Sequence, residues 1–114
     1  MTDLAVTESA DTIYAEATMA GAAGVAIVRV SGPASREILF GLTGKTPVPR
    51  VARHVKLVSP SDGDIIDHGL VLWFPGPGSF SGEDVAEFHI HGGRAVVGCL
   101  MGVIQKYPGV RLAE

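Results

Sequence analysis

The stretch GVAIVRVSGP, residues 24–33, decides the fold class of this chain. Its first part, Val25–Val30, is apolar except for Arg29, and such a run predicts a strand buried on both faces. The SGP that follows ends this strand, and proline suits the first turn of a helix. Apolar residues at helical spacing continue as far as Gly44, a typical residue just beyond a helix end. A helix is therefore expected over residues 33–43.

The rest of the chain contains more strands than helices. Polar and apolar residues alternate over residues 54–58, the turn-forming SDGD follows, and residues 65–74 are mostly apolar, which predicts a hairpin. This mixture of hairpins and crossovers predicts an α+β fold, in which helices pack against one mixed β-sheet. Residues 1–10 are polar and unpatterned, so we expect a flexible tail before a single domain at residues 11–114. The remaining expected elements are strands at residues 11–17, 85–90 and 110–112 and a helix at residues 95–106.

The composition narrows the function classes. Of the 114 residues, 46% are hydrophobic and 18% charged, which suits one folded core and excludes general disorder. The 9 basic and 12 acidic side chains give a net charge of −3, which disfavours nucleic-acid binding by this chain alone. Its single cysteine, Cys99, excludes an internal disulfide. The start lacks a signal peptide and no run approaches the ~18 apolar residues of a membrane span, so a cytoplasmic protein without a membrane partner is expected.

Gly44-Lys45-Thr46 has the ending of a nucleotide-binding P-loop. The complete motif needs a glycine at the position of Leu39, and it follows a strand, whereas this segment follows an expected helix. A helix end and a linker explain the segment better. We therefore expect no GTPase activity and no catalytic residue in this chain.

Glu87, His89 and His91 alternate with apolar residues along an expected strand. Alternate residues of a strand point to one face at ~7 Å steps, and imidazoles presented in this way can hold a metal ion. His68 or Glu83 could add a ligand, which makes a small metal-dependent protein one alternative. A solvated sheet face explains the same pattern without a metal, so no metal site is expected.

A second group of residues suggests a binding site. Glycines in the loop FSGED, residues 80–84, and in HGG, residues 91–93, let the backbone approach a ligand, and a glycine pair at a helix start directs N–H groups at an anion. Arg29 on an apolar strand needs a carboxylate partner or an anionic ligand. Two tight turns and an internal ion pair remain the simpler explanations. The residue types favour a candidate site around Arg29, Glu83, Glu87 and His91.

Several motifs, in order, resemble one known family. The match covers about residues 11–114 and resembles the N-terminal domain of the MnmE (TrmE) family of tRNA modification GTPases. The first loop departs from the family pattern, which is close to Pro-Pro-Gly-Arg-Gly, because MAGAA at residues 19–23 has no arginine. The motifs that carry the resemblance are DTI at 11–13, GVAIVRVSGP at 24–33, GLVLWFPGP at 69–77, SFSGED at 79–84, HGG at 91–93 and PGVRLAE at 108–114.

The resemblance implies a fold similar to the tetrahydrofolate-binding domain of aminomethyltransferases. It also implies that the domain binds a folate one-carbon donor such as 5-formyl-tetrahydrofolate and holds a homodimer together. The family's longer protein has a helical domain with an inserted G domain, which uses GTP, magnesium and potassium and is not among these 114 residues. With the flavoprotein MnmG (GidA), it modifies carbon 5 of the wobble uridine of tRNA. This chain is therefore expected to be a fragment of a longer GTPase.

The resemblance also suggests roles for the candidate residues. A pterin presents an amino group and a ring N–H along one edge, and a carboxylate from Glu83 or Glu87 could accept both. The anionic glutamate tail of a folate suits Arg29 or the N–H groups of a glycine pair. A pure dimerisation module without a ligand is the other alternative. The cofactor-binding residues expected at one end of the sheet are Arg29, Phe80, Glu83, Glu87, His91, Gly92 and Gly93.

Overall fold

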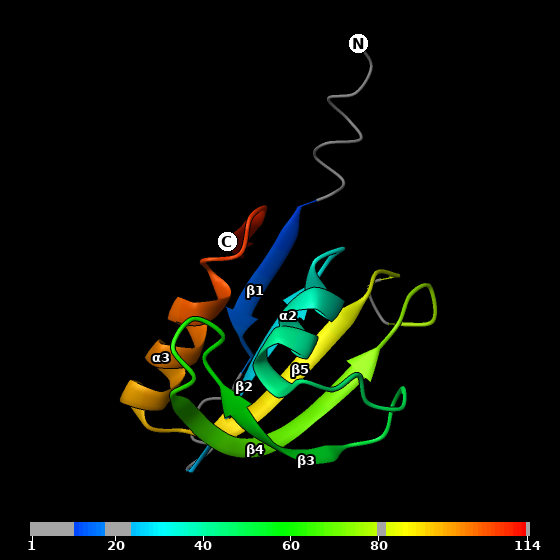
Figure 1. The fold of residues 1–114 in the computed structure, drawn as a ribbon. Coiled ribbons are helices and arrows are strands. Elements are labelled where there is room, and N and C mark those ends of the chain that lie inside the picture. The colour runs from blue at the N-terminus through cyan, green and yellow to red at the C-terminus, as the bar shows by residue number, and fades with distance from the viewer. Residues whose placement is uncertain (1–10, 18–23, 80–81, 114) are drawn as a thin grey trace.

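The computed structural model describes residues 11–17, 24–79 and 82–113, which form one mixed sheet with two helices (Figure 1). The strand order is β3-β4-β5-β2-β1-β6, and neighbours are antiparallel except for the parallel pair β1 and β6. This arrangement confirms the predicted α+β class. The expected tail at residues 1–10, the loop at residues 19–23 and Phe80 lie outside the described residues. The elements are β1 (Thr12–Glu16), β2 (Val25–Ser31), α2 (Ser35–Thr43), β3 (Arg53–Val58), β4 (Ile65–Phe74), β5 (Val85–His91), α3 (Arg94–Ile104) and β6 (Val110–Leu112).

Both helices lie on one face of the sheet and enclose the hydrophobic core there (Figure 1). On strand β2, Ala26, Val28 and Val30 point into this core and are at most 1% exposed. On the other side of the same strand, Val25 is 49% exposed and Arg29 is only half-buried. The prediction that this strand is buried on both faces is therefore wrong, because neither described helix covers the second face.

The second face of the sheet, here called the open face, carries a charged pair among apolar side chains. The strand registers place Leu72, Glu87, Arg29 and Ala15 in one row across β4, β5, β2 and β1. Most of the apolar side chains on this face are half-buried or exposed. An apolar sheet face of this kind usually packs against another element or another molecule.

The junction between β1, β2 and α2 explains where the first helix begins. The helix starts at Ser35, two residues later than expected, and Pro33 lies in the preceding turn. Thr12 Oγ1 accepts a hydrogen bond from the N–H of Ala34 at 2.8 Å, so a side chain of strand β1 satisfies a donor at the helix start. The expected helix end is confirmed, since Gly44 adopts a left-handed conformation with a φ of 73°.

The other expected elements are confirmed with small shifts at their ends. Strands β3 and β4 form the predicted hairpin, and Asp62 Oδ1 accepts a hydrogen bond from the Asp64 N–H in its turn at 3.0 Å. The second helix, α3, is two residues shorter at its C-terminal end than predicted. Within the described part of the chain, no helix is both long enough and apolar enough to cross a membrane.

Candidate functional site

An ion pair between neighbouring strands forms the centre of the open face. Arg29 on β2 lies directly opposite Glu87 on β5, and its Nη2 and Nε lie 2.8 Å and 2.9 Å from Glu87 Oε2. His89 Nε2 donates to the other oxygen, Oε1, at 3.0 Å. The Glu87 side chain is 11% exposed and the Arg29 side chain 37% exposed. A buried carboxylate thus holds an arginine whose outer part still faces solvent.

Glu83 lies at the neighbouring end of the open face. Ser31 Oγ donates to Glu83 Oε1 at 3.2 Å. Ser31 and Arg29 are two residues apart on the same strand, which places them ~7 Å apart on the same face. The structure therefore brings Glu83, Arg29 and Glu87 to one region of the sheet, as expected.

Asp84, the residue just before β5, accepts two hydrogen bonds from backbone N–H groups. Asp84 Oδ1 accepts the N–H of Gly76 at 2.9 Å, and the Asp84 carbonyl accepts the N–H of Gly32 at 2.9 Å. The first bond ties Asp84 to the segment that follows strand β4, and the second ties it to the turn that follows strand β2. The start of β5, and with it Glu83, is thereby held beside the end of β2.

His91, Gly92 and Gly93 lie at the opposite end of β5. The stretch from Glu83 to Gly92 spans roughly 30 Å at ~3.3 Å per residue, so the expected site is divided between two ends of the sheet. The N–H of Gly92 already donates to the carbonyl of Gly24 at 3.1 Å. The expectation of one compact site failed because the length of the intervening strand separates the two glycines from Glu83.

Asp67 organises this second end, and sequence reasoning did not identify it. Its Oδ2 accepts the His91 N–H at 2.8 Å, and its two oxygens accept the His91 Nδ1–H at 2.9 Å and 3.0 Å. Burial alone would raise the pKa of Asp67. The hydrogen bonds from the backbone and side chain of His91 and from the His68 N–H, together with the charge of His91, outweigh burial and hold the pKa of Asp67 below its ordinary value of 3.8.

The histidines do not assemble the proposed metal site. Glu87 and His89 are in contact, but His91 turns to Asp67 instead. Across residues 11–17, 24–79 and 82–113, no group of three or more histidine, cysteine, aspartate or glutamate side chains is placed to hold a metal ion. The metal-dependent alternative therefore gains no support from the geometry.

The hollow beside Arg29 is small. It has a volume of about 90 Å³ and lies between Arg29, Ser31 and the residues of strand β1. Pockets that hold ligands of drug size measure roughly 300–1,000 Å³. The described residues of one chain therefore do not enclose a ligand of that size beside Arg29.

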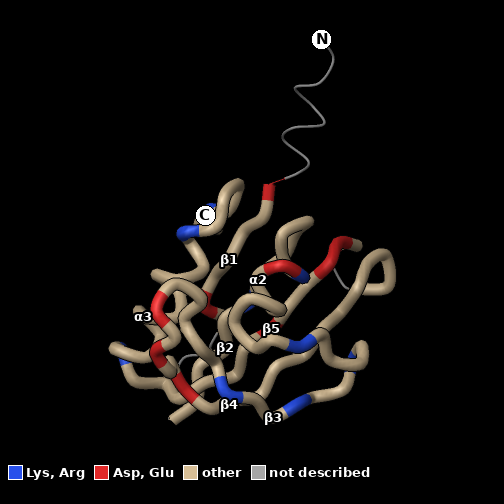
Figure 2. The backbone as a smooth tube through the Cα atoms, in the orientation of Figure 1, with Lys and Arg blue, Asp and Glu red and all other residues tan. Residues whose placement is uncertain are grey.

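Two further features concern the surface as a whole. Basic and acidic residues are interspersed along the described chain, with some basic residues near β3 (Figure 2).

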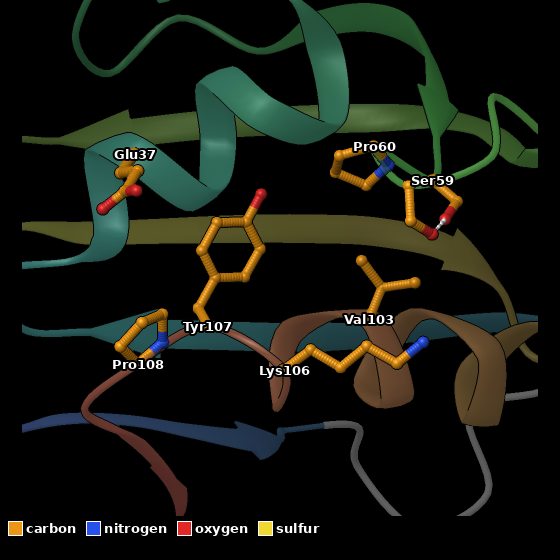
Figure 3. Close-up of a pocket in the computed structure, with 8 residues that line it drawn as sticks. Glu37, Ser59, Pro60, Val103, Lys106, Tyr107 and Pro108 are labelled. Carbon is orange, nitrogen blue, oxygen red and sulfur yellow. Dashed lines mark hydrogen bonds between the residues drawn. The ribbon is translucent and has the colours of Figure 1, made fainter.

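A larger cavity of about 390 Å³ lies on the helix-covered side, between α2, the end of α3 and the β3–β4 turn (Figure 3). Sequence reasoning predicted none of its lining residues, because three segments distant in the sequence form it.

Comparison with known proteins gives a consistent result. The family described as GTP-binding protein TrmE N-terminus matches residues 12–114. The tRNA modification GTPase MnmE of Azorhizobium caulinodans is 50% identical over 108 residues, which are 95% of this chain and 25% of that protein. The mitochondrial 5-taurinomethyluridine-[tRNA] synthase subunit GTPB3 of Danio rerio is 51% identical over 104 residues, which are 91% of this chain and 21% of that protein.

A third relative has a similar extent of match. The tRNA modification GTPase MnmE of Rhodospirillum rubrum is 49% identical over 116 residues, which cover 91% of this chain and 26% of that protein. The chain therefore spans about a quarter of the length of these curated relatives.

Proposed function

The chain belongs to the family of TrmE N-terminal domains, and on this basis we propose that it binds a reduced folate, 5-formyl-tetrahydrofolate, and pairs with a second copy of itself. Its curated relatives are named for tRNA modification. In the longer protein the bound folate supplies a one-carbon unit for carbon 5 of the wobble uridine of tRNA, with MnmG as the flavoprotein partner. GTP hydrolysis belongs to the part of that protein outside these residues.

The observation that carries this proposal is the ion pair of Arg29 and Glu87 on the open face, which neither described helix covers. Both oxygens of Glu87 already accept hydrogen bonds, from Arg29 and from His89. Glu87 is therefore better suited to position Arg29 than to bind a pterin. The Arg29 side chain is 37% exposed, so a carboxylate of the anionic glutamate tail of the folate can approach its guanidinium group.

Glu83 is the better candidate for the pterin edge. It is exposed and lies at the same end of the open face as Arg29. A carboxylate there can accept the amino group and the ring N–H of the pterin in a bidentate pair. Gly92 and Gly93 lie too far along β5 to share a small head group with Glu83, so we assign them no contact with the pterin.

The small size of the hollow beside Arg29 supports a role for a second copy. At about 90 Å³ it cannot enclose a pterin, whose binding needs walls on both sides of the ring. The apolar residues around it, including Ile13 and Ala15, are half-buried on a face without a helical cover. We propose that a second chain packs on this face and completes the site.

Calorimetric titration with 5-formyl-tetrahydrofolate tests the assignment. Glu83→Gln replaces one acceptor oxygen by an amide NH2 group, so one ligand donor faces another donor and loses its partner, and we expect binding to weaken about 10-fold to 100-fold. Glu16→Gln, an exposed carboxylate on β1 with a matched change, should bind like the wild type.

Each other outcome has a defined meaning. Equal affinity of Glu83→Gln and wild type would show that Glu83 does not hold the pterin. A wild-type chain that dimerises but gives no heat at millimolar ligand would be the pure dimerisation module, which the apolar residues of the open face also suit.

A further inference from the structure

The cavity on the helix-covered side has the size and lining of a ligand site. Its volume of about 390 Å³ falls in the range of roughly 300–1,000 Å³ that is typical of small-molecule pockets. Val103 from the last turn of α3, Tyr107 from the segment just after α3, and Pro60 from the β3–β4 turn give it apolar walls (Figure 3). It lies on the other side of the sheet from Arg29 and Glu87, so it is distinct from the proposed folate site.

The Tyr107 hydroxyl supplies a polar group inside the cavity. Gly41 on α2 makes room for it, because a Cβ at that position would collide with the hydroxyl oxygen. Burial raises the pKa of Tyr107, and the nearby charge of Glu37 raises it further, so the phenol keeps its proton and can donate. Within the described residues, no other group forms a hydrogen bond with this hydroxyl, which leaves it available to a ligand.

Two opposite charges flank the aromatic ring. Figure 3 shows Glu37 on one side of Tyr107 and the ammonium group of Lys106 on the other. Neither side chain has an ion pair among the described residues. A ligand that carries a positive group at one end and a negative group at the other would match this arrangement.

We propose that this cavity binds a flat organic zwitterion, with its amine at Glu37, its carboxylate at Lys106 and its ring on Tyr107. The aromatic and proline walls favour a planar, unsaturated body over a flexible chain, since stacked rings gain contact without losing rotamer freedom. The two charges set the orientation of the ligand. Because both charged groups lie at the exposed rim, they contribute modestly and their effect declines with salt.

The probe that tests this proposal is 4-(aminomethyl)benzoate, titrated into the isotope-labelled chain while amide chemical shifts are recorded. We expect saturable shifts at Ser59, Ser61, Val103 and Tyr107, and no comparable shifts on strand β2. Benzylamine and benzoate each carry one of the two charges, so each should bind about twofold to fivefold more weakly than the zwitterion.

Charge-removing variants identify which end of the ligand each residue holds. Glu37→Gln should weaken binding of the zwitterion and of benzylamine, and leave that of benzoate unchanged. Lys106→Met should weaken binding of the zwitterion and of benzoate, and leave that of benzylamine unchanged. Both residues are exposed, so the fold should persist, and the matched exposed controls Glu16→Gln and Lys45→Met should have no effect.

Three results would overturn the proposal. These are the absence of saturable shifts around the cavity, equal affinity for the zwitterion and both single-charge analogues, or a response to the control variants as large as that to Glu37→Gln and Lys106→Met.

Discussion

At the scale of single residues, two long-range side-chain pairs organise strand β5. Glu87 reaches Arg29 across 58 positions of sequence, and His91 reaches Asp67 across 24. Each carboxylate accepts more than one hydrogen bond and is shielded from solvent, with 11% of its side chain exposed. Both pairs therefore fix the neighbouring strands against one another.

Asp67 makes the stability of this domain depend on pH in the acid range. The pKa of Asp67 is lowered in the folded state. Its contribution to the free energy of unfolding is therefore fully present above the unfolded-state pKa of 3.8, and it is lost as the pH falls through the lower pKa of the folded state. We expect Asp67→Asn to lower the free energy of unfolding at pH 7 by about 1 kcal/mol. Urea unfolding at a series of pH values should show the difference from wild type shrinking below about pH 4. A difference that stays constant down to pH 2.5 would contradict this assignment.

The residue pairs also show what the sequence could and could not predict. The pattern of Glu87, His89 and His91 correctly indicated one common face, because strand periodicity is local. Their partners depend on which strands become neighbours, which no local pattern reports. The sequence therefore allowed an ion pair for Arg29 but could not identify Asp67.

At the scale of elements, the tightest constraint is the junction where β1, β2 and α2 meet. Gly32 has a φ of 135°, and a Cβ at this position would lie 2.6 Å from Thr12 Cα and 2.7 Å from the Asp11 carbonyl oxygen. Both atoms belong to the backbone and cannot rotate away. The same Thr12 also caps the start of α2 through the Ala34 N–H.

Gly32→Ala should therefore be strongly destabilising. We expect the loss in the free energy of unfolding to be about 3 kcal/mol or more, since backbone strain and a clash add together. Gly98→Ala in helix α3 is the matched control, because a Cβ there meets nothing within 4 Å. It should be neutral or stabilise the domain by up to about 1 kcal/mol. Thermal or urea unfolding of both variants measures the contrast, and equal stabilities would refute the close approach at Gly32.

The positions of the helices and strands could be predicted closely from the sequence, but the exposure of one face of the sheet could not. The helix end at Gly44 and the hairpin turn around Asp62 depend on local backbone chemistry, and both were predicted correctly. The error over Val25–Val30 has a different origin. An apolar strand is also expected where a partner molecule covers one face, so composition alone cannot separate a helix-covered face from one that awaits a partner.

At the scale of the whole molecule, both described helices lie on one side of the sheet, and no other described helix or strand packs on the open face (Figure 1). Leu70 and Val25 on the open face are 40% and 49% exposed. Their exposure, together with the incomplete hollow beside Arg29, is what the proposed homodimer explains.

Leu70→Lys should shift the chain from dimer to monomer, because it places a charge in the proposed apolar interface. Light scattering at micromolar concentration should then give the monomer mass of 11.8 kDa, whereas the wild type should give twice that value. Phe40→Lys is the matched control, since Phe40 is 56% exposed on helix α2 and should leave the dimer intact. A monomeric wild type, or dissociation by the Phe40 change alone, would contradict an interface on the open face.

The most direct test of the whole account is a titration of the isotope-labelled wild-type chain with 5-formyl-tetrahydrofolate, followed by amide chemical shifts. We expect saturable shifts at Arg29, Ser31 and Glu83 on the open face, with residues around Tyr107 on the helix-covered side unchanged. The absence of saturable shifts at millimolar folate, or shifts confined to the helix-covered side, would contradict it.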